Sequence, residues 1–288
     1  MQRLFHRVIW LCALLLAPLA AWAAPLDVAV SILPQKFFVQ TIGGADVRVQ
    51  VMVRPGFDPA TYDPTPRQLA ELTQARLYFA IGVPFESSWL GRFQAVNPKM
   101  KIVYTQRGIQ RLAAATGRPG PHPNPHIWLS PPLVRIQAAN ILRALVAADP
   151  AHAATFRRGY ARLIDIIDAI DTKIGHKLLN VDLANRRFMV FHPAFYYFAR
   201  CYDLEEIPIQ IEGKSPSPKE LARLIQMARR DHIRVIFVEP QFSQRAARTL
   251  AAQIGAQVRI INPLPENWPA GMEAIAAALS EALASTSS

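Results

Sequence analysis

The stretch 149–179, DPAHAATFRRGYARLIDIIDAIDTKIGHKLL, decides the fold of this chain. After Asp149 and Pro150, apolar residues return every three or four positions from Phe156 to Leu178. That spacing predicts one helix with a single apolar stripe. About 30 residues at about 1.5 Å each give a rod of roughly 45 Å, long enough to join two lobes. A short coiled coil is the alternative, although the flanking α/β pattern favours packing against the chain's own lobes.

Short apolar runs alternate with helical patterns on both sides of this helix. Four such runs are expected as strands in each half, at 27–33, 47–53, 77–81 and 101–104, then at 188–191, 206–209, 235–238 and 258–261. Continuously apolar strands separated by helices are typical of parallel sheets covered on both faces. The prediction is an α/β fold of two lobes, each with a four-stranded, mainly parallel sheet flanked by helices, joined by one long rigid helix.

Two helix starts carry the same local signal in the two halves. Residues 65–68 (TPRQ) and 217–220 (SPKE) both read as capping boxes with proline at the first helical position. Their parallel placement suggests that the two lobes are related.

The first 23 residues predict a cleavable signal peptide. Arg3 and Arg7 precede an apolar run, and residues 21–23 (AWA) have the small-x-small form of a cleavage site. The run contains Pro18 and is shorter than the about 20 residues that a membrane helix needs. We therefore expect a soluble mature protein exported to the periplasm; a retained anchor is the alternative.

The expected domain organisation follows from these signals. The signal peptide covers residues 1–23 and the N-terminal α/β lobe 24–130. Linking helices cover 131–184, including the long helix at about 150–179, and the C-terminal α/β lobe covers 185–288.

Charge and cysteine content narrow the function classes. The net charge is +11 and falls to +9 without Arg3 and Arg7, but lysine and arginine are scattered and form no aromatic-basic stripe. We therefore predict no nucleic-acid partner. Only Cys201 remains after the signal peptide, so no intrachain disulfide can form, and we expect it to be a small core residue.

Two histidines stand at the edges of apolar runs, His126 in 125–131 (PHIWLSP) and His192 in 188–193 (FMVFHP). A neutral imidazole at a strand exit can direct a metal-binding nitrogen into a cleft. Ligands of open parallel sheets bind at the carboxyl ends of the strands. The two histidines therefore either clamp one ion between the lobes or form a structural hydrogen bond across a closed cleft.

Five segments together resemble the zinc- and manganese-type periplasmic solute-binding proteins of metal ABC importers, the cluster A-I family. The segments are 55–66 (PGFDPATYDPTP), 126–131 (HIWLSP), 191–198 (FHPAFYYF), 238–242 (VEPQF) and 262–264 (NPL). The resemblance implies two lobes bridged by a rigid helix and one metal ion in the cleft. It also implies an ABC permease as membrane partner and a monomeric receptor.

The same resemblance implies four ligand positions, which match Ala60, His126, His192 and Asn262. Ala60 has no donor and Asn262 offers only an amide oxygen, so the metal site is altered. A catalytic or open zinc site still requires three protein ligands. The expected metal ligands are His126, His192, Glu239 and Asn262, unless Glu239 instead pairs with an arginine of its lobe. Two further replacements for the missing histidine stay open, a carboxylate from Asp58 or Asp63 and His122 on its loop.

The leading functional hypothesis is an exported receptor that captures a divalent transition metal, zinc first and manganese second, and delivers it to an ABC permease. A metal-independent relative that presents the cleft to another solute or a partner protein is the alternative. A metal-assisted hydrolase has less support, because the chain lacks Gly-x-Ser-x-Gly, His-Glu-x-x-His and phosphate-loop motifs. The chain is therefore predicted not to be an enzyme.

Overall fold

The computed structural model describes residues 24–112, 123–182, 185–210 and 216–284. The predicted signal peptide and His122 lie outside the described residues. Among the helices in these ranges, none combines the length and the apolar character needed to span a bilayer.

The elements fall into two α/β halves with helices between them. The first half contains β1 (Leu26–Val30), α2 (Leu33–Gly43), β2 (Val47–Val51), α3 (Pro66–Leu72), β3 (Leu77–Ala80), α4 (Pro84–Val96) and β4 (Lys101–Tyr104). The short turn η3 (Ile127–Leu129), α5 (Pro131–Ala148), η4 (Pro150–His152) and α6 (Ala153–Leu179) follow. The second half contains β5 (Arg187–Val190), α7 (Tyr196–Cys201), β6 (Glu205–Pro208), α8 (Pro218–Arg230), β7 (Val235–Val238), α9 (Gln244–Ile254), β8 (Gln257–Ile260) and α10 (Trp268–Ala284).

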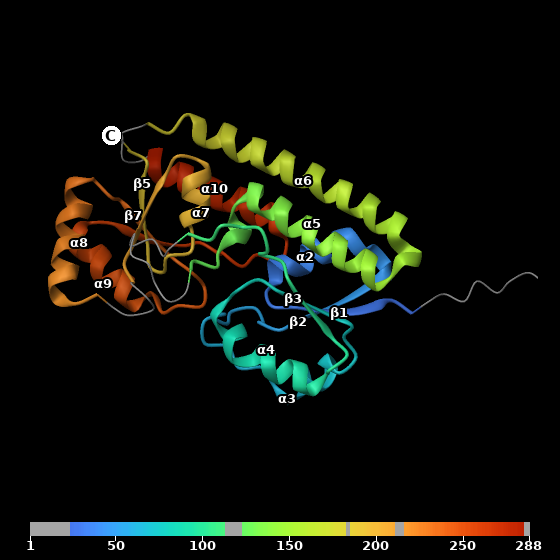
Figure 1. Cartoon of the computed structure of the whole chain (residues 1–288). Helices are drawn as coiled ribbons and strands as arrows, with labels where there is room; N and C mark the ends of the chain where they lie inside the picture. The colour runs from blue at the N-terminus through green and yellow to red at the C-terminus, as the bar shows by residue number, and fades with distance from the viewer. Residues whose placement is uncertain (1–23, 113–122, 183–184, 211–215, 285–288) are drawn as a thin grey trace, which may run out of the picture.

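The two sheets have the same topology. Their strand orders are β2-β1-β3-β4 and β6-β5-β7-β8, and every neighbouring pair is parallel. All eight predicted strands are present, so the predicted fold class is confirmed. In Figure 1, α3 and α4 cover one face of the first sheet while α2 lies on the other side.

The two predicted capping boxes are also present. The Thr65 hydroxyl accepts the backbone N–H of Gln68, and the Ser217 hydroxyl accepts that of Glu220. In both cases a proline follows the cap, so the local sequence alone defines where α3 and α8 begin.

Helix α6 bridges both halves and contacts α2 in the first and α10 in the second. Its 27 residues give a length of about 40 Å, and it runs along one side of the molecule in Figure 1. The described helix begins at Ala153, after the short turn η4, rather than at Pro150. A Cβ at Gly159 would overlap the carbonyl oxygen of Ile42, so α6 and α2 pack backbone against backbone.

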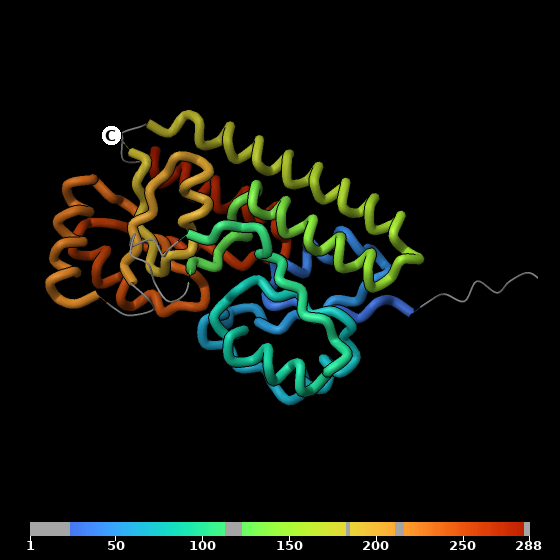
Figure 2. Tube along the Cα trace, in the orientation of Figure 1, coloured from blue at the N-terminus to red at the C-terminus, as the bar shows by residue number. Residues whose placement is uncertain are grey.

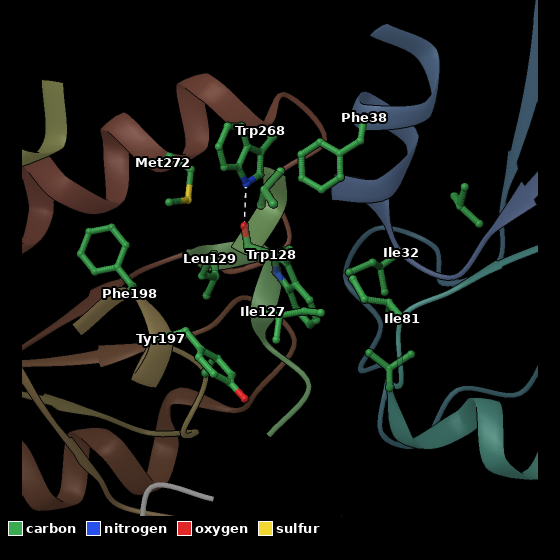
Figure 3. Close-up of a cluster of buried hydrophobic side chains, with 14 of the residues drawn as sticks. Ile32, Phe38, Ile81, Ile127, Trp128, Leu129, Tyr197, Phe198, Trp268 and Met272 are labelled. Carbon is green, nitrogen blue, oxygen red and sulfur yellow. Dashed lines mark hydrogen bonds between the residues drawn. The ribbon is translucent and has the colours of Figure 1, made fainter. Parts of the chain in front are cut away.

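One hydrophobic core extends through both halves, and a smaller cluster lies between the second sheet and helices α8 and α9. Trp128 and Trp268 are fully buried in the main core. Figure 3 shows them between Phe38 on one side and Phe198 on the other. In Figure 2 the green segment that leads into α5 passes between the halves. The domain boundaries stay a prediction, since this core is shared.

Two details differ from the sequence expectations. The pattern did not predict α10, whose residues are mostly alanine and apolar, so that no polar face marks a helical period. Cys201 is exposed rather than part of the core, with its Sγ 3.1 Å from the Ser130 hydroxyl.

Candidate metal centre

His126 directly precedes η3, and this turn is bonded to the second half of the chain. The indole N–H of Trp128 donates to the carbonyl of Pro263 over 2.6 Å. The indole N–H of Trp268 donates to the carbonyl of Trp128 over 2.8 Å, as Figure 3 shows. The segment that carries His126 is therefore held against the lobe that carries His192.

His192 follows the end of β5 by two residues, where the neighbouring chain still pairs in register. The N–H of Phe191 donates to the carbonyl of Phe237, and the N–H of Gln210 donates to the carbonyl of Phe191. The structure brings the two predicted histidines together, with ring centroids 5.3 Å apart and ring planes at 72°. His126 also packs on Trp128 at 5.0 Å, and His192 packs on Phe242 at the same distance.

Both imidazoles are neutral at neutral pH. Burial among protein atoms, and then the neighbouring His192, lower the pKa of His126 well below its ordinary 6.5. Burial lowers the pKa of His192 from 6.5 to about 4, although the negative charge of Asp58 opposes part of this effect. Neutral imidazoles are the form that binds a metal ion. The Nδ1 atom of His192 is buried and has no hydrogen-bond partner among the described residues.

Glu239 is the residue after β7, and the β5–β7 register brings it beside His192. Its side chain is 1% exposed, and neither carboxylate oxygen has a hydrogen-bond partner in the part of the chain that the structure describes. Burial raises the pKa of Glu239 well above its usual value, and the negative charges of Glu206 and Asp58 raise it further. The backbone N–H groups of Glu239 and His192 oppose this shift without making regular hydrogen bonds. No arginine in the described ranges forms an ion pair with it.

Glu206 is a second buried carboxyl group that the sequence analysis missed. One carboxylate oxygen accepts the N–H of Phe195 over 2.6 Å, and the other is buried without a partner among the described residues. Burial raises the pKa of Glu206 to about 8, and the Phe195 N–H lowers it in part. The negative charge of Glu206 also raises the pKa of Glu239, so a cation close to both groups would favour their ionised forms.

Asn262 lies on the cleft between the halves. It is exposed, and its amide oxygen accepts the N–H of Leu264 over 2.9 Å. It lines a cavity of about 70 Å³ between the halves, opposite residues 54–56 and next to Pro240. Asn262 therefore stays a predicted ligand whose oxygen already takes part in a local turn.

The residues near Ala60, which matches the family's first ligand position, make different contacts. Ala60 is exposed, and its N–H donates to the Asp58 carboxylate over 2.8 Å. Asp63 accepts the indole N–H of Trp89 over 3.1 Å. The charge of Asp58 acts on both His192 and Glu239.

The arrangement is not yet a closed coordination sphere. Within the described ranges, no three histidine, cysteine, aspartate or glutamate side chains converge closely enough to hold an ion as they stand. The carboxylate side chains must turn toward the two imidazoles before all of them can reach one ion.

Asn124 and Tyr197 are further residues at this site that the sequence analysis missed. Asn124 is 4% exposed, and its side-chain oxygen accepts the backbone N–H of His126 over 3.0 Å. The order Asn-Pro-His provides a signal for this turn, because asparagine commonly accepts the N–H two residues onward. Tyr197 donates its hydroxyl to the Asn124 carbonyl over 3.1 Å.

Residues 28–282 match the protein family described as ZnuA, zinc-uptake complex component A, periplasmic. The iron-binding protein YfeA of Yersinia pestis is 30% identical over 221 residues, which cover 76% of this chain and 70% of that protein. The high-affinity zinc uptake system protein ZnuA of Bacillus subtilis is 26% identical over 257 residues, covering 83% and 78% of the two chains.

Solved structures agree with this match. A crystal structure of ZnuA superposes with a TM-score of 0.85 at 38% identity and covers 90% of this chain and 99% of that chain. A manganese-bound periplasmic metal-binding protein from Candidatus Liberibacter asiaticus has a TM-score of 0.81 at 21% identity, covers 90% and 99%, and supports the fold alone. The chain belongs to the ZnuA family of periplasmic metal-binding proteins of metal ABC importers.

Proposed function

We propose that this protein is a receptor that captures a divalent transition metal ion between its lobes and delivers it to an ABC permease. His126 and His192 supply imidazole nitrogens and Glu239 supplies a carboxylate. Asn262 is the predicted fourth position, at the rim of the same cleft. Zinc is the first expected cargo and manganese the second.

One observation carries this proposal: a buried carboxyl group without a hydrogen-bond partner stands beside two neutral imidazoles. A carboxylate removed from water is unfavourable by several kcal/mol unless a cation or donors compensate it. In the described structure Glu239 has no cation partner and no regular hydrogen bond, and the backbone N–H groups of Glu239 and His192 compensate it only in part. A divalent ion would supply the missing charge and would favour the ionised form of Glu239, whose pKa burial raises.

The donor set supports zinc ahead of manganese. Two imidazoles and one carboxylate match the three-ligand form of an open zinc site, in which water occupies the fourth position. Manganese is favoured by oxygen ligands, and Asp58, whose charge acts on His192, is a further carboxylate near the site. A zinc-bound ZnuA deletion mutant is 39% identical with a TM-score of 0.85 over 90% of this chain and 98% of that chain.

A metal-independent receptor of the same fold is the second candidate. It is favoured by Ala60, which has no donor, and by the absence of three converged ligand side chains in the described ranges. Under this alternative the histidines would only hold the cleft closed.

Isothermal titration of the chain from residue 24 onward with Zn²⁺, Mn²⁺ and Fe²⁺ separates the two functions. The first predicts one site per chain, loss of that site in His192→Ala, and unchanged binding in His176→Ala, an exposed residue of α6. Absence of binding to any of the three ions, or equal binding by His192→Ala, would support the metal-independent receptor instead.

A further inference from the structure

In the turn before His126, the side-chain oxygen of Asn124 makes one hydrogen bond more than the turn itself requires. Asn124 accepts the backbone N–H of His126 over 3.0 Å, and the same oxygen lies 2.7 Å from Nδ1 of the His126 ring. Two other turns near the cleft, Asp58-Pro59-Ala60 and Asn262-Pro263-Leu264, contain only the backbone bond. The additional bond is therefore specific to the histidine.

These two hydrogen bonds determine which nitrogen of the His126 ring carries the proton. A backbone N–H is always a donor, so the Asn124 atom that faces it must be the amide oxygen rather than the nitrogen. An amide oxygen only accepts, so Nδ1 of His126 must carry the hydrogen. The neutral ring then has its lone pair on Nε2.

Asn124 is itself held from the other half of the molecule. Its N–H donates to the carbonyl of Leu112 over 3.1 Å, and its carbonyl accepts the Tyr197 hydroxyl. The same hydroxyl oxygen accepts the N–H of Leu112 over 2.9 Å. Tyr197 is buried on α7, so a side chain of the second half fixes the backbone that orients His126.

We propose that Asn124 is a positioning residue that presets His126 as the Nδ1–H tautomer and presents Nε2 to the metal ion, with Tyr197 holding Asn124 in place. This inference rests on the proposed role of His126 as a ligand. Partners of this kind commonly change metal affinity by about 10- to 100-fold when they are removed. Asn124 therefore contributes to affinity without touching the ion.

Two variants of Asn124 separate positioning from general stability. Asn124→Leu removes the acceptor at similar size, and Asn124→Asp restores an acceptor oxygen. We expect zinc affinity to fall by about 10- to 100-fold in the first and to return to within a few-fold of wild type in the second. Tyr197→Phe keeps the ring and should give a smaller loss in the same direction.

Asn97→Leu is the matched control for folding. Asn97 is another buried asparagine, whose amide donates to the carbonyls of Leu72, Thr73 and Ala75, far in sequence from either histidine. It should lose stability, as measured by urea unfolding, while keeping its zinc affinity.

The tautomer itself is read from ¹⁵N chemical shifts of the His126 ring in metal-free protein. Wild type and Asn124→Asp should show a protonated Nδ1, and Asn124→Leu should show a substantial Nε2–H population. An unchanged tautomer in Asn124→Leu, or a changed tautomer with unchanged affinity, would overturn the positioning role. Full zinc affinity in His126→Ala would instead overturn the proposed ligand role, whatever the tautomer.

Discussion

Ala60 and His126 occupy the same position in the same kind of turn. Each directly follows an Asx-Pro pair, and each donates its backbone N–H to the Asx side-chain oxygen, over 2.8 Å to Asp58 and 3.0 Å to Asn124. The first half of the cleft therefore contains two equivalent turns, of which only one carries an imidazole.

Ala60→His should strengthen metal binding. Asp58 would stand to the new imidazole as Asn124 stands to His126, accepting Nδ1–H and leaving Nε2 for the ion. A third imidazole fills an open position of the proposed zinc site, so titration should show at least about tenfold tighter zinc binding. Thr61→His, one residue further along the same loop, should not give this gain. Equal zinc affinity in Ala60→His and wild type would show that the turn does not face the ion.

The contact between α6 and α2 should tolerate no side chain at Gly159. Gly159→Ala should lower the free energy of unfolding by about 1–3 kcal/mol, because the Cβ would overlap the carbonyl oxygen of Ile42. Gly175→Ala on the same helix meets no atom within 4 Å and should raise it by about 0.5–1 kcal/mol. Urea unfolding of both variants measures the difference. Equal destabilisation would mean that α6 does not pack closely on α2.

Trp268→Phe should destabilise the junction between the lobes. It leaves the buried carbonyl of Trp128 without its donor, which costs about 1–3 kcal/mol. Trp89→Phe is the matched control, because the indole N–H of Trp89 donates to the exposed Asp63. This variant should lower the free energy of unfolding by less than about 1 kcal/mol. Thermal and urea unfolding compare the two. A loss of stability in Trp89→Phe as large as in Trp268→Phe would contradict the claim that the hydrogen bond from Trp268 to Trp128 stabilises the junction between the lobes.

The stability of the protein should depend on pH through Glu206 and the two histidines. The folded pKa of Glu206, about 8, exceeds its unfolded value near 4.5, so its contribution is full below pH 4.5 and is lost as pH rises through 8. The folded pKa of His192, about 4, lies below its unfolded 6.5, so stability is lost as pH falls from 6.5 through 4. Glu206→Gln is always neutral.

Glu206→Gln should therefore gain stability over wild type between pH 5 and 8, by an amount on the order of a few kcal/mol at the upper end. Urea unfolding of metal-free protein across this pH range measures the gain. A constant difference between the two proteins at all these pH values would mean that Glu206 titrates as it does in water.

The sequence predicted the sheets because buried parallel strands are continuously apolar, and it predicted the starts of α3 and α8 because their caps are local. It did not predict α10, whose apolar residues surround the helix and leave no polar period. Its place is decided by tertiary packing of Trp268 and Met272 in the shared core.

For the site, the sequence pointed to the two histidines because each stands at the edge of an apolar run. The role of Asn124 was not, because an Asx-Pro turn is common and its second bond to Nδ1 depends on the orientation of the His126 ring. The burial of Glu239 and Glu206 likewise follows from neighbouring strands of one sheet, which no local pattern encodes.

The most direct test is a crystal structure of the zinc-loaded protein with anomalous data collected at the zinc edge. We predict one strong peak in the cleft, about 2.0–2.2 Å from an imidazole nitrogen of both His126 and His192 and from a carboxylate oxygen of Glu239. A peak bound by only one of these histidines, or located elsewhere on the chain, would contradict the account.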